Sequence, residues 1–332
     1  MRITLTKPGL LTTIQDLGRM GYFSQAVPVS GAMDSLSAQT ANKALGNDED
    51  CALIEFTQSG AAFITESEGL MAFSGDGAYL NTDSQRLPSD RPIFIPAGTN
   101  LYLENNKSGS RSYLAVAGGW DVLEVLGSRS TYLTARIGGL AGKCLAENDR
   151  LTNTGKLTLL TKSILDSLKG ETINYPNWSI ARNLFLPENQ KIIRVLPGRE
   201  FNWFDAASKA GFLSQPYTVG HNSNRMGYHL QGMALNRAID GELLSTAVTP
   251  GTIQVTNDGS LILLMADCQT TGGYPRVAQV AAVDMPLCAQ LKPGDTINFK
   301  EISWKEAERL YLQFKFDMHK LSLAVEQKYG VG

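Results

Sequence analysis

The sequence predicts a mainly β protein that contains two similar β domains and a few helices. Most apolar runs are short, rich in β-branched and aromatic residues, and separated by Gly, Pro, Asn and Asp. This spacing is typical of barrels and sandwiches and not of alternating βαβ units. The 332 residues are 43% hydrophobic and 19% charged, which suits a globular chain long enough for two cores.

Ten runs are expected to form strands, because each is apolar, short and bounded by turn-forming residues. They are Ala61–Ile64, Leu70–Phe73, Ile93–Ile95, Leu101–Leu103, Tyr113–Val116, Ile192–Leu196, Ile253–Val255, Leu261–Met265, Val277–Val283 and Thr296–Phe299.

Two windows of the sequence recur in the same order. Gly60–Asp76 aligns without a gap against Gly251–Asp267, with Gly, Thr, Leu and Asp at matching positions. Further on, Pro96–Leu103 resembles Lys292–Phe299, and both windows run from a turn into a strand. Repeated windows at similar separation indicate an internal duplication. We therefore expect one β domain in residues 1–160 and a second in 191–302, joined by a linker at 161–190.

Three helices are expected between and after the strands. The first runs from Leu36 to Leu45, with Asp34 or Ser35 as its N-cap and Gly46 at its end. A second is expected over Trp203–Phe212.

The third helix occupies the C-terminal segment, 303–332. Ser303 and Glu306 have the spacing of a capping box. Apolar residues follow at helical spacing: Ala307, Leu310, Tyr311, Phe314, Met318, Leu321 and Ala324. This spacing predicts a helix that either packs on its own barrel or contacts a partner protein.

Charge and composition exclude several classes of protein. The net charge is −2, and no basic stripe marks a nucleic-acid surface. The longest apolar stretch, Leu261–Ala266, is too short to span a membrane. The N-terminus has no signal-peptide pattern, so we expect a cytoplasmic protein. The four cysteines lack zinc or disulfide spacing and only three histidines occur, so no metal site is expected.

One loop, Asp267–Pro275, concentrates polar groups directly after an apolar strand, where binding residues commonly lie. A glycine pair in it lets a ligand approach the backbone. The polar side chains and backbone N–H groups of the loop suit a planar, carbonyl-rich ligand or an anion. The alternative is a tight structural turn capped by the aspartate. The candidate residues are Asp267, Gln269, Thr270, Thr271, Gly272, Gly273 and Tyr274.

Other candidate residues lie outside this loop. Arg225 offers a guanidinium for a carboxylate or phosphate, or else forms a structural ion pair. Gln15, Asp16 and Arg19 either bind substrate or form a hydrogen-bonded network that fixes the first loop. The Gly-rich stretch Gly138–Cys144 is not a phosphate loop, because its glycine spacing is wrong and Cys replaces Ser or Thr.

Four segments occur in the order found in a known family. They are KPGLLTTIQDLGRMGYFSQAVPVSGAMD (Lys7–Asp34), RVLPG (Arg194–Gly198), SNRMG (Ser223–Gly227) and DCQTTGGYPRVAQV (Asp267–Val280). Through them the chain resembles the family formed by the C subunits of 5-oxoprolinases and by allophanate hydrolase subunit 2, which is related to the carboxyltransferase domain of urea carboxylase. The resemblance runs from about Lys7 to Phe299 and implies two cyclophilin-like β-barrel domains.

The implied activity is ATP-dependent opening of the 5-oxoproline lactam to L-glutamate, in a complex with a homologous B subunit and with an A subunit. ATP, with Mg²⁺, would be a co-substrate of that complex. Biotin is not supported, because no Met-Lys-Met attachment motif occurs. The alternatives are a component acting on allophanate or urea, and a non-catalytic regulatory partner of a B-type protein.

The resemblance also implies roles for the candidate residues. The loop's amide, hydroxyls and backbone would hold a substrate carbonyl or a phosphorylated intermediate, since developing oxyanion charge needs hydrogen-bond donors. Arg225 and Gln269 would act in catalysis with Asp267 as the best carboxylate, and Tyr274 would shape the wall. Gln15, Asp16 and Arg19 are further binding candidates that would face the B subunit.

Overall fold

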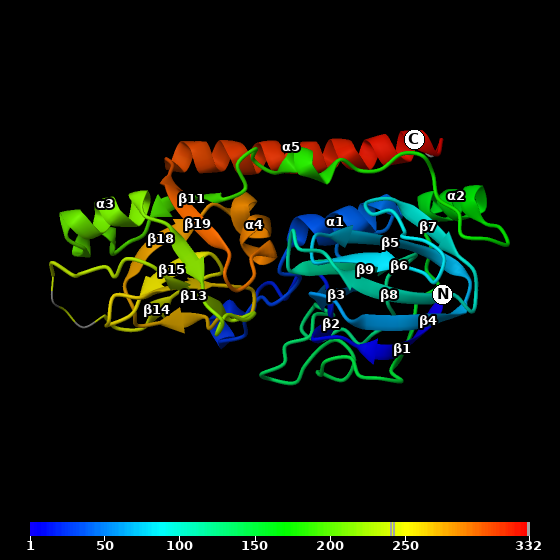
Figure 1. Cartoon of the computed structure of the whole chain (residues 1–332), viewed down its shortest axis with the longest axis horizontal. Coiled ribbons are helices and arrows are strands. Elements are labelled where there is room, and N and C mark those ends of the chain that lie inside the picture. Colours follow the sequence, from blue (N-terminus) through cyan, green and yellow to red (C-terminus); the bar gives the residue numbers. More distant parts are fainter. Residues whose placement is uncertain (240, 242, 331–332) are drawn as a thin grey trace. The chain divides into compact units, whose positions relative to one another are not determined.

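The computed structural model describes residues 1–239, 241 and 243–330. The chain divides into two compact units, each assembled from separate stretches (Figure 1). The first unit comprises Met1–Gly18, Asp34–Leu184 and Phe316–Gly332, and the second comprises Arg19–Met33 and Phe185–Lys315. Each unit contains one large hydrophobic core.

The first unit contains two antiparallel five-stranded sheets, ordered β10-β1-β4-β8-β6 and β2-β3-β9-β5-β7. Apolar side chains from both sheets form its core. The strands are β1 (Arg2–Pro8), β2 (Leu11–Gln15), β3 (Leu53–Thr57), β4 (Ala61–Ser67), β5 (Gly69–Gly75), β6 (Ala78–Asn81), β7 (Pro92–Ile95), β8 (Asn100–Asn105), β9 (Arg111–Val116) and β10 (Arg150–Thr152).

The second unit is built on a closed barrel of order β11-β18-β15-β16-β13-β12-β19. Beside the barrel lies a two-stranded sheet of β14 and β17. The strands are β11 (Ile192–Pro197), β12 (Tyr217–Val219), β13 (Gly227–Gln231), β14 (Thr246–Ala247), β15 (Thr252–Val255), β16 (Leu261–Leu264), β17 (Thr271–Gly272), β18 (Arg276–Val280) and β19 (Thr296–Glu301). The predicted mainly β class is confirmed.

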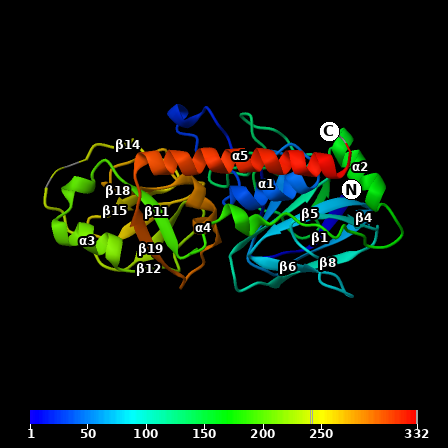
Figure 2. The same cartoon turned by 90° about the horizontal axis from the view of Figure 1, so that it is seen from above.

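Five α-helices are described, together with short 3-10 turns at Phe23–Gln25, Arg182–Phe185, Phe201–Trp203 and Ala282–Asp284. The α-helices are α1 (Ser35–Ala44), α2 (Leu159–Leu168), α3 (Ala206–Ser214), α4 (Met285–Gln290) and α5 (Trp304–Lys328). Helix α1 packs on β5 and β9, and α3 packs on β19. Figure 2 shows α5 as one unbroken helix.

The three helix predictions are confirmed with shifted ends. Residues 331 and 332 of the predicted C-terminal segment lie outside the described residues. Asp34 is the N-cap of α1, because its carboxylate accepts hydrogen bonds from the Ser37 backbone N at 3.0 Å and Ser37 Oγ at 2.6 Å. Helix α3 begins later than expected, since Asp205 caps it by accepting from Ser208 N at 2.6 Å. At α5, Ser303 Oγ accepts from Glu306 N at 3.2 Å.

Residues 161–190 were expected to form a linker, but part of this stretch is a packed helix. It includes most of α2, whose side chain Ile164 is fully buried in the first unit. Thr158 caps this helix by accepting from Thr161 N at 3.0 Å. A packed helix therefore begins before the predicted domain boundary.

The two repeated windows form strands in both units, at β4, β5 and β8 and at β15, β16 and β19. Their hydrogen-bonded neighbours differ, however. Strands β15 and β16 pair with each other, whereas β4 and β5 lie in different sheets. The cyclophilin-like topology and the duplication therefore stay predictions.

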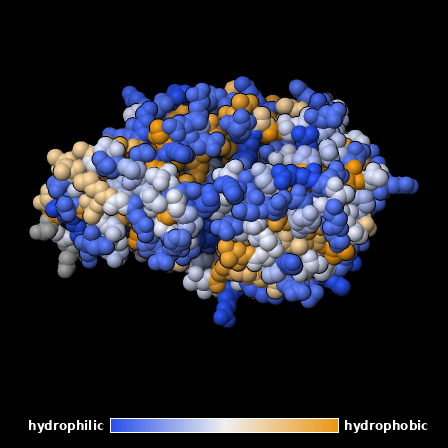
Figure 3. Space-filling view, viewed as in Figure 1, coloured by the Kyte–Doolittle hydropathy of each residue, from blue (hydrophilic) through white to orange (hydrophobic). Residues whose placement is uncertain are grey.

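The surface is mixed in character. On the face drawn in Figure 3, hydrophobic side chains form separate patches among hydrophilic ones. Within the described part of the chain, none of the helices has the length and hydropathy needed to cross a membrane.

Candidate functional site

A cavity of about 240 Å³ lies on the outer face of the barrel, over β13, β15 and β16. Side chains alternate across a strand, so one set faces the core while the next set faces outward. Tyr228 and Leu263 belong to the core, whereas His229, Gln254 and Ile262 line the cavity. The last three are aligned across the three strands, because His229 and Gln254 both pair with Ile262.

The loop Asp267–Pro275 covers part of this outer face, and its beginning is fixed by a buried ion pair. Arg225 Nε lies 2.7 Å from Asp267 Oδ2, and Arg225 Nη2 lies 3.1 Å from Asp267 Oδ1. Arg225 Nη2 also donates to the Gly31 carbonyl at 2.7 Å, and Asp267 N donates to the Arg225 carbonyl at 2.8 Å. Neither charged side chain lines the cavity. Arg225 and Asp267 therefore position the start of the loop and do not face the cavity.

The end of the loop is fixed by a second two-point ion pair. Arg276 Nε lies 2.7 Å from Glu200 Oε2, and Arg276 Nη2 lies 2.6 Å from Glu200 Oε1. Burial alone would raise the pKa of the Glu200 carboxyl, but hydrogen bonds and charge from Arg276 outweigh it and lower that pKa. Arginine–carboxylate pairs of this two-point type hold geometry as well as charge. The loop is therefore anchored on both sides.

Two of the predicted loop residues reach the cavity. Gln269 and Tyr274 line it together with Gln254. Gln269 Nε2 donates to Gln254 Oε1 at 3.4 Å, and Gln254 Nε2 donates to the Tyr274 carbonyl at 3.3 Å. Both hydrogen bonds are long and hence weak. A ligand that offers a carbonyl and an N–H can replace them at small cost.

The other predicted loop residues shape the loop and do not line the cavity. Thr270 is buried and accepts a hydrogen bond from Val248 N at 3.0 Å through its carbonyl. Thr271 and Gly272 form β17 and pair with β14. A side chain at Gly272 would place its Cβ 2.5 Å from Gln254 Nε2, whereas one at Gly273 would have its nearest neighbour at 3.4 Å. A side chain at position 272 would therefore displace the Gln254 amide.

Cys268 contributes packing and not a nucleophile. Its side chain is buried in a small cluster with Val248 and Leu264. Burial, together with the neighbouring Asp267 charge, raises the pKa of the Cys268 thiol to about 12. The reactive form of cysteine is the thiolate, so this thiol is inert near neutral pH.

The three candidate residues near the N-terminus do not all lie in the same unit. Gln15 and Asp16 belong to the first unit and Arg19 to the second, where Arg19 N donates to the Val29 carbonyl at 2.7 Å. The Asp16 carboxylate accepts hydrogen bonds from Ser128 Oγ at 2.7 Å and Ser130 Oγ at 2.5 Å. Asp16 therefore joins the end of β2 to the segment 128–130. A network shared with Gln15 and Arg19 stays a prediction.

Gln15 is fully buried in the same unit. Its side-chain Nε2 donates to Thr13 Oγ1 at 2.9 Å and to the Thr131 carbonyl at 3.3 Å. These contacts fix β2 against the loop that follows residue 128.

Among the residues of the cavity that sequence reasoning missed are Gln254 and His229. Both lie on strands, where an isolated polar residue gives no motif. The signal that could have found them is the alternation along β13 and β15, which predicts that His229 and Gln254 share the outward face. His229 lies near the loop because β13 pairs with β16, a pairing over a long separation that the sequence does not specify.

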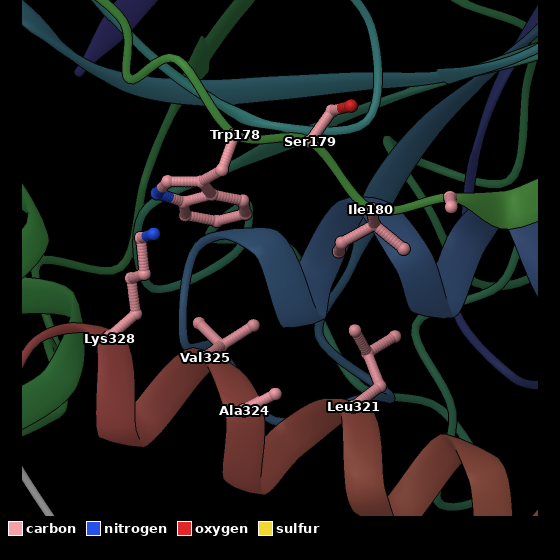
Figure 4. Close-up of a pocket in the computed structure, with 8 residues that line it drawn as sticks. Trp178, Ser179, Ile180, Leu321, Ala324, Val325 and Lys328 are labelled. Atoms are coloured by element: carbon pink, nitrogen blue, oxygen red, sulfur yellow. The ribbon is translucent and has the colours of Figure 1, made fainter.

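A different cavity, of about 220 Å³, lies in the first unit between α5 and the segment 178–181 (Figure 4). Its walls are mostly apolar, with Ile180 facing Leu321 and Val325. The Ser179 hydroxyl points away from α5, and Lys328 is the charged side chain in the lining. This lining offers few hydrogen-bond donors, so the barrel cavity is the better candidate for amide chemistry.

Residues 25–301 match the family described as carboxyltransferase domain, subdomain A and B, and the chain belongs to that family.

Among individual relatives, the chain is 37% identical over 324 residues to the 5-oxoprolinase C subunit of Escherichia coli, covering 96% of this chain and 99% of the relative. It is 33% identical to the 5-oxoprolinase C subunit of Haemophilus influenzae, covering 95% and 96%. The solved urea carboxylase of Kluyveromyces lactis superimposes with a TM-score of 0.85 at 28% identity over 96% of this chain. The chain spans only 29% of that larger enzyme.

Proposed function

We propose that this chain is the C subunit of an ATP-dependent 5-oxoprolinase, which opens the 5-oxoproline lactam to L-glutamate together with its A and B subunits. The observation that carries the proposal is the match along 99% of the length of a 5-oxoprolinase C subunit. The match to urea amidolyase of Saccharomyces cerevisiae, by contrast, covers 17% of that enzyme. Agreement over the whole length of a relative favours the 5-oxoprolinase assignment.

The barrel cavity supports this assignment chemically. A lactam presents a carbonyl oxygen and an N–H side by side, and a carboxamide side chain presents the complementary pair. Gln254 and Gln269 lie within hydrogen-bonding reach of each other in the cavity. Their N–H groups would donate to the substrate carbonyl and stabilise the negative charge that develops there.

Nucleotide binding is assigned to the complex and not to this cavity. The lining residues include no carboxylate that could hold Mg²⁺ and no Lys or Arg that could hold a triphosphate. In addition, the described residues contain no group of three or more His, Cys, Asp or Glu placed to bind a metal. The proposal therefore treats ATP as a co-substrate bound elsewhere in the complex, and this chain as one wall of a shared site.

The test is co-expression with candidate A and B subunits, followed by an assay of L-glutamate formation from 5-oxoproline with and without ATP. We expect glutamate formation that depends on ATP and on all three proteins. A well-formed three-protein complex that releases no glutamate would refute the proposal.

The second candidate is a component that acts on allophanate, favoured by the urea amidolyase relatives and by the TM-score of 0.84 to the Kluyveromyces lactis urea amidolyase. The same preparation decides between the two. Turnover of allophanate without ATP, in the absence of 5-oxoproline turnover, would establish the second candidate. Tight association without turnover of either substrate would indicate a non-catalytic partner.

A further inference from the structure

His229 occupies a distinctive position on the barrel. It projects from the outward face of β13 and borders the candidate site on one side and a neighbouring cavity of about 470 Å³ on the other. Its backbone is held by the sheet, where His229 pairs with Ile262 of β16. Two contacts with the preceding loop add to this: His229 N donates to Ser223 Oγ at 3.2 Å and Gly220 N donates to the His229 carbonyl at 2.7 Å. The ring is therefore presented from a rigid strand.

Within the residues that line the candidate site, His229 is the one side chain able to carry a positive charge. The two nearby arginines are committed elsewhere: Arg225 pairs with Asp267, and Arg276 pairs with Glu200. The proposed substrate, 5-oxoproline, carries a carboxylate beside its lactam. A buried or half-buried carboxylate needs a cationic or strongly hydrogen-bonding partner. Gln254 and Gln269 suit the lactam, which leaves the carboxylate to His229.

We propose that His229 binds the carboxylate of the substrate while the Gln254 and Gln269 carboxamides bind its lactam. This inference rests on the proposed function and deepens it, because it names the feature that separates an amino-acid lactam from an unsubstituted one. His229 is then a specificity-determining residue of the site.

Few other charges face this imidazole. The strands that pair with β13, namely β12 and β16, carry no Asp, Glu, Lys or Arg. The linings of the two cavities add Tyr274 and His221 as titratable groups. A bound carboxylate would therefore be the main charge near this ring.

The experiment uses the assembled three-protein complex and compares 5-oxoproline with 2-pyrrolidinone, the same lactam without the carboxylate. We expect His229→Gln to raise KM for 5-oxoproline about 10- to 100-fold, which corresponds to loss of one charge-assisted hydrogen bond. The inhibition constant of 2-pyrrolidinone should stay unchanged. His229→Arg should restore a low KM, because its guanidinium keeps the positive charge.

His221→Gln is the matched control, since His221 is an exposed histidine that borders the neighbouring cavity and not the candidate site. It should leave both constants unchanged.

The outcomes separate the inference from the function on which it rests. Normal wild-type turnover with an unchanged KM in His229→Gln would overturn the carboxylate assignment and leave the proposed function standing. Equal weakening of 5-oxoproline and 2-pyrrolidinone would also overturn it, because the residue would then act on the shape of the site. A wild-type complex without ATP-dependent turnover would refute the function and the inference together.

Discussion

Arg225 and Asp267 form a buried two-point ion pair that fixes the start of the candidate loop, with Nε–Oδ2 and Nη2–Oδ1 distances of 2.7 and 3.1 Å. Both residues are 5% exposed. A second pair, between Glu200 and Arg276, fixes the far end of the same loop. Rigid support of this kind is what a binding loop needs if its side chains are to meet a ligand without first being ordered.

Removing one partner of the first pair should destabilise the protein. Asp267→Ala leaves a buried guanidinium without its carboxylate, so the free energy of unfolding should fall by about 3–5 kcal/mol. Urea denaturation followed by circular dichroism measures this loss. Arg309→Ala, which breaks the exposed pair with Glu306, is the control and should produce no measurable change. Equal stabilities of the two variants would contradict the anchoring role of Asp267.

The second pair predicts a pH dependence of stability. Because Arg276 lowers the pKa of Glu200 in the folded protein, the carboxylate contributes stability above the unfolded-state pKa of about 4.3. That contribution is lost as pH falls through the folded-state pKa. Glu200→Gln should therefore be less stable than the wild type near neutral pH, and the difference should shrink on acidification. Denaturation midpoints measured from neutral pH down to about pH 3 follow this difference; a constant difference would contradict the prediction.

The two glycines of the loop should respond differently to substitution. In Gly272→Ala the new Cβ meets the Gln254 amide at 2.5 Å, so that amide must move away from its place in the cavity. A displacement of this size should lower kcat/KM of the complex roughly 10- to 100-fold. Gly273→Ala is the matched control, because its nearest neighbour lies at 3.4 Å. Similar kcat/KM values for the two variants would show that turnover does not depend on the position of the Gln254 amide.

The cysteines should differ in reactivity. Cys268 and Cys288 are buried, whereas Cys51 and Cys144 are partly exposed. Burial raises the pKa of the Cys51 thiol to about 11, so Cys144 should react first with a thiol-specific reagent at mildly alkaline pH. Mass spectrometry of the labelled protein identifies the modified residue. Rapid labelling of Cys268 in the folded protein would contradict its assignment as an inert packing residue.

The sequence was sufficient where a local signal marks a local structure. Asp34 and Gly46 stand at the ends of α1, and the loop Asp267–Pro275 follows a strand as its composition predicted. Helix α2 was missed as a packed element, although Thr158 gives it an N-cap. The turn just before α3 also shifted the start of that helix, because Asp205 and not an earlier residue provides the cap.

The candidate site could be predicted only in part, because its remaining members come together through tertiary structure. Gln269 and Tyr274 were named from the loop and do line the cavity. His229 reaches it through the pairing of β13 with β16, two strands far apart in sequence, whereas Gln254 lies in the hairpin of β15 and β16 and belongs to no motif. The alternative roles of Arg225, in ligand binding or in an ion pair, could be separated only when Asp267 was seen beside it.

The most direct test of the central claim, that this loop is one wall of a lactam site, is the turnover of 5-oxoproline by a complex carrying Gln269→Ala. Gln269 is exposed and its side chain donates one long hydrogen bond, to Gln254, so the variant should fold and assemble normally. If its amide stabilises developing charge, kcat/KM should fall by roughly 10²- to 10³-fold. An intact complex with unchanged kcat/KM would contradict the account.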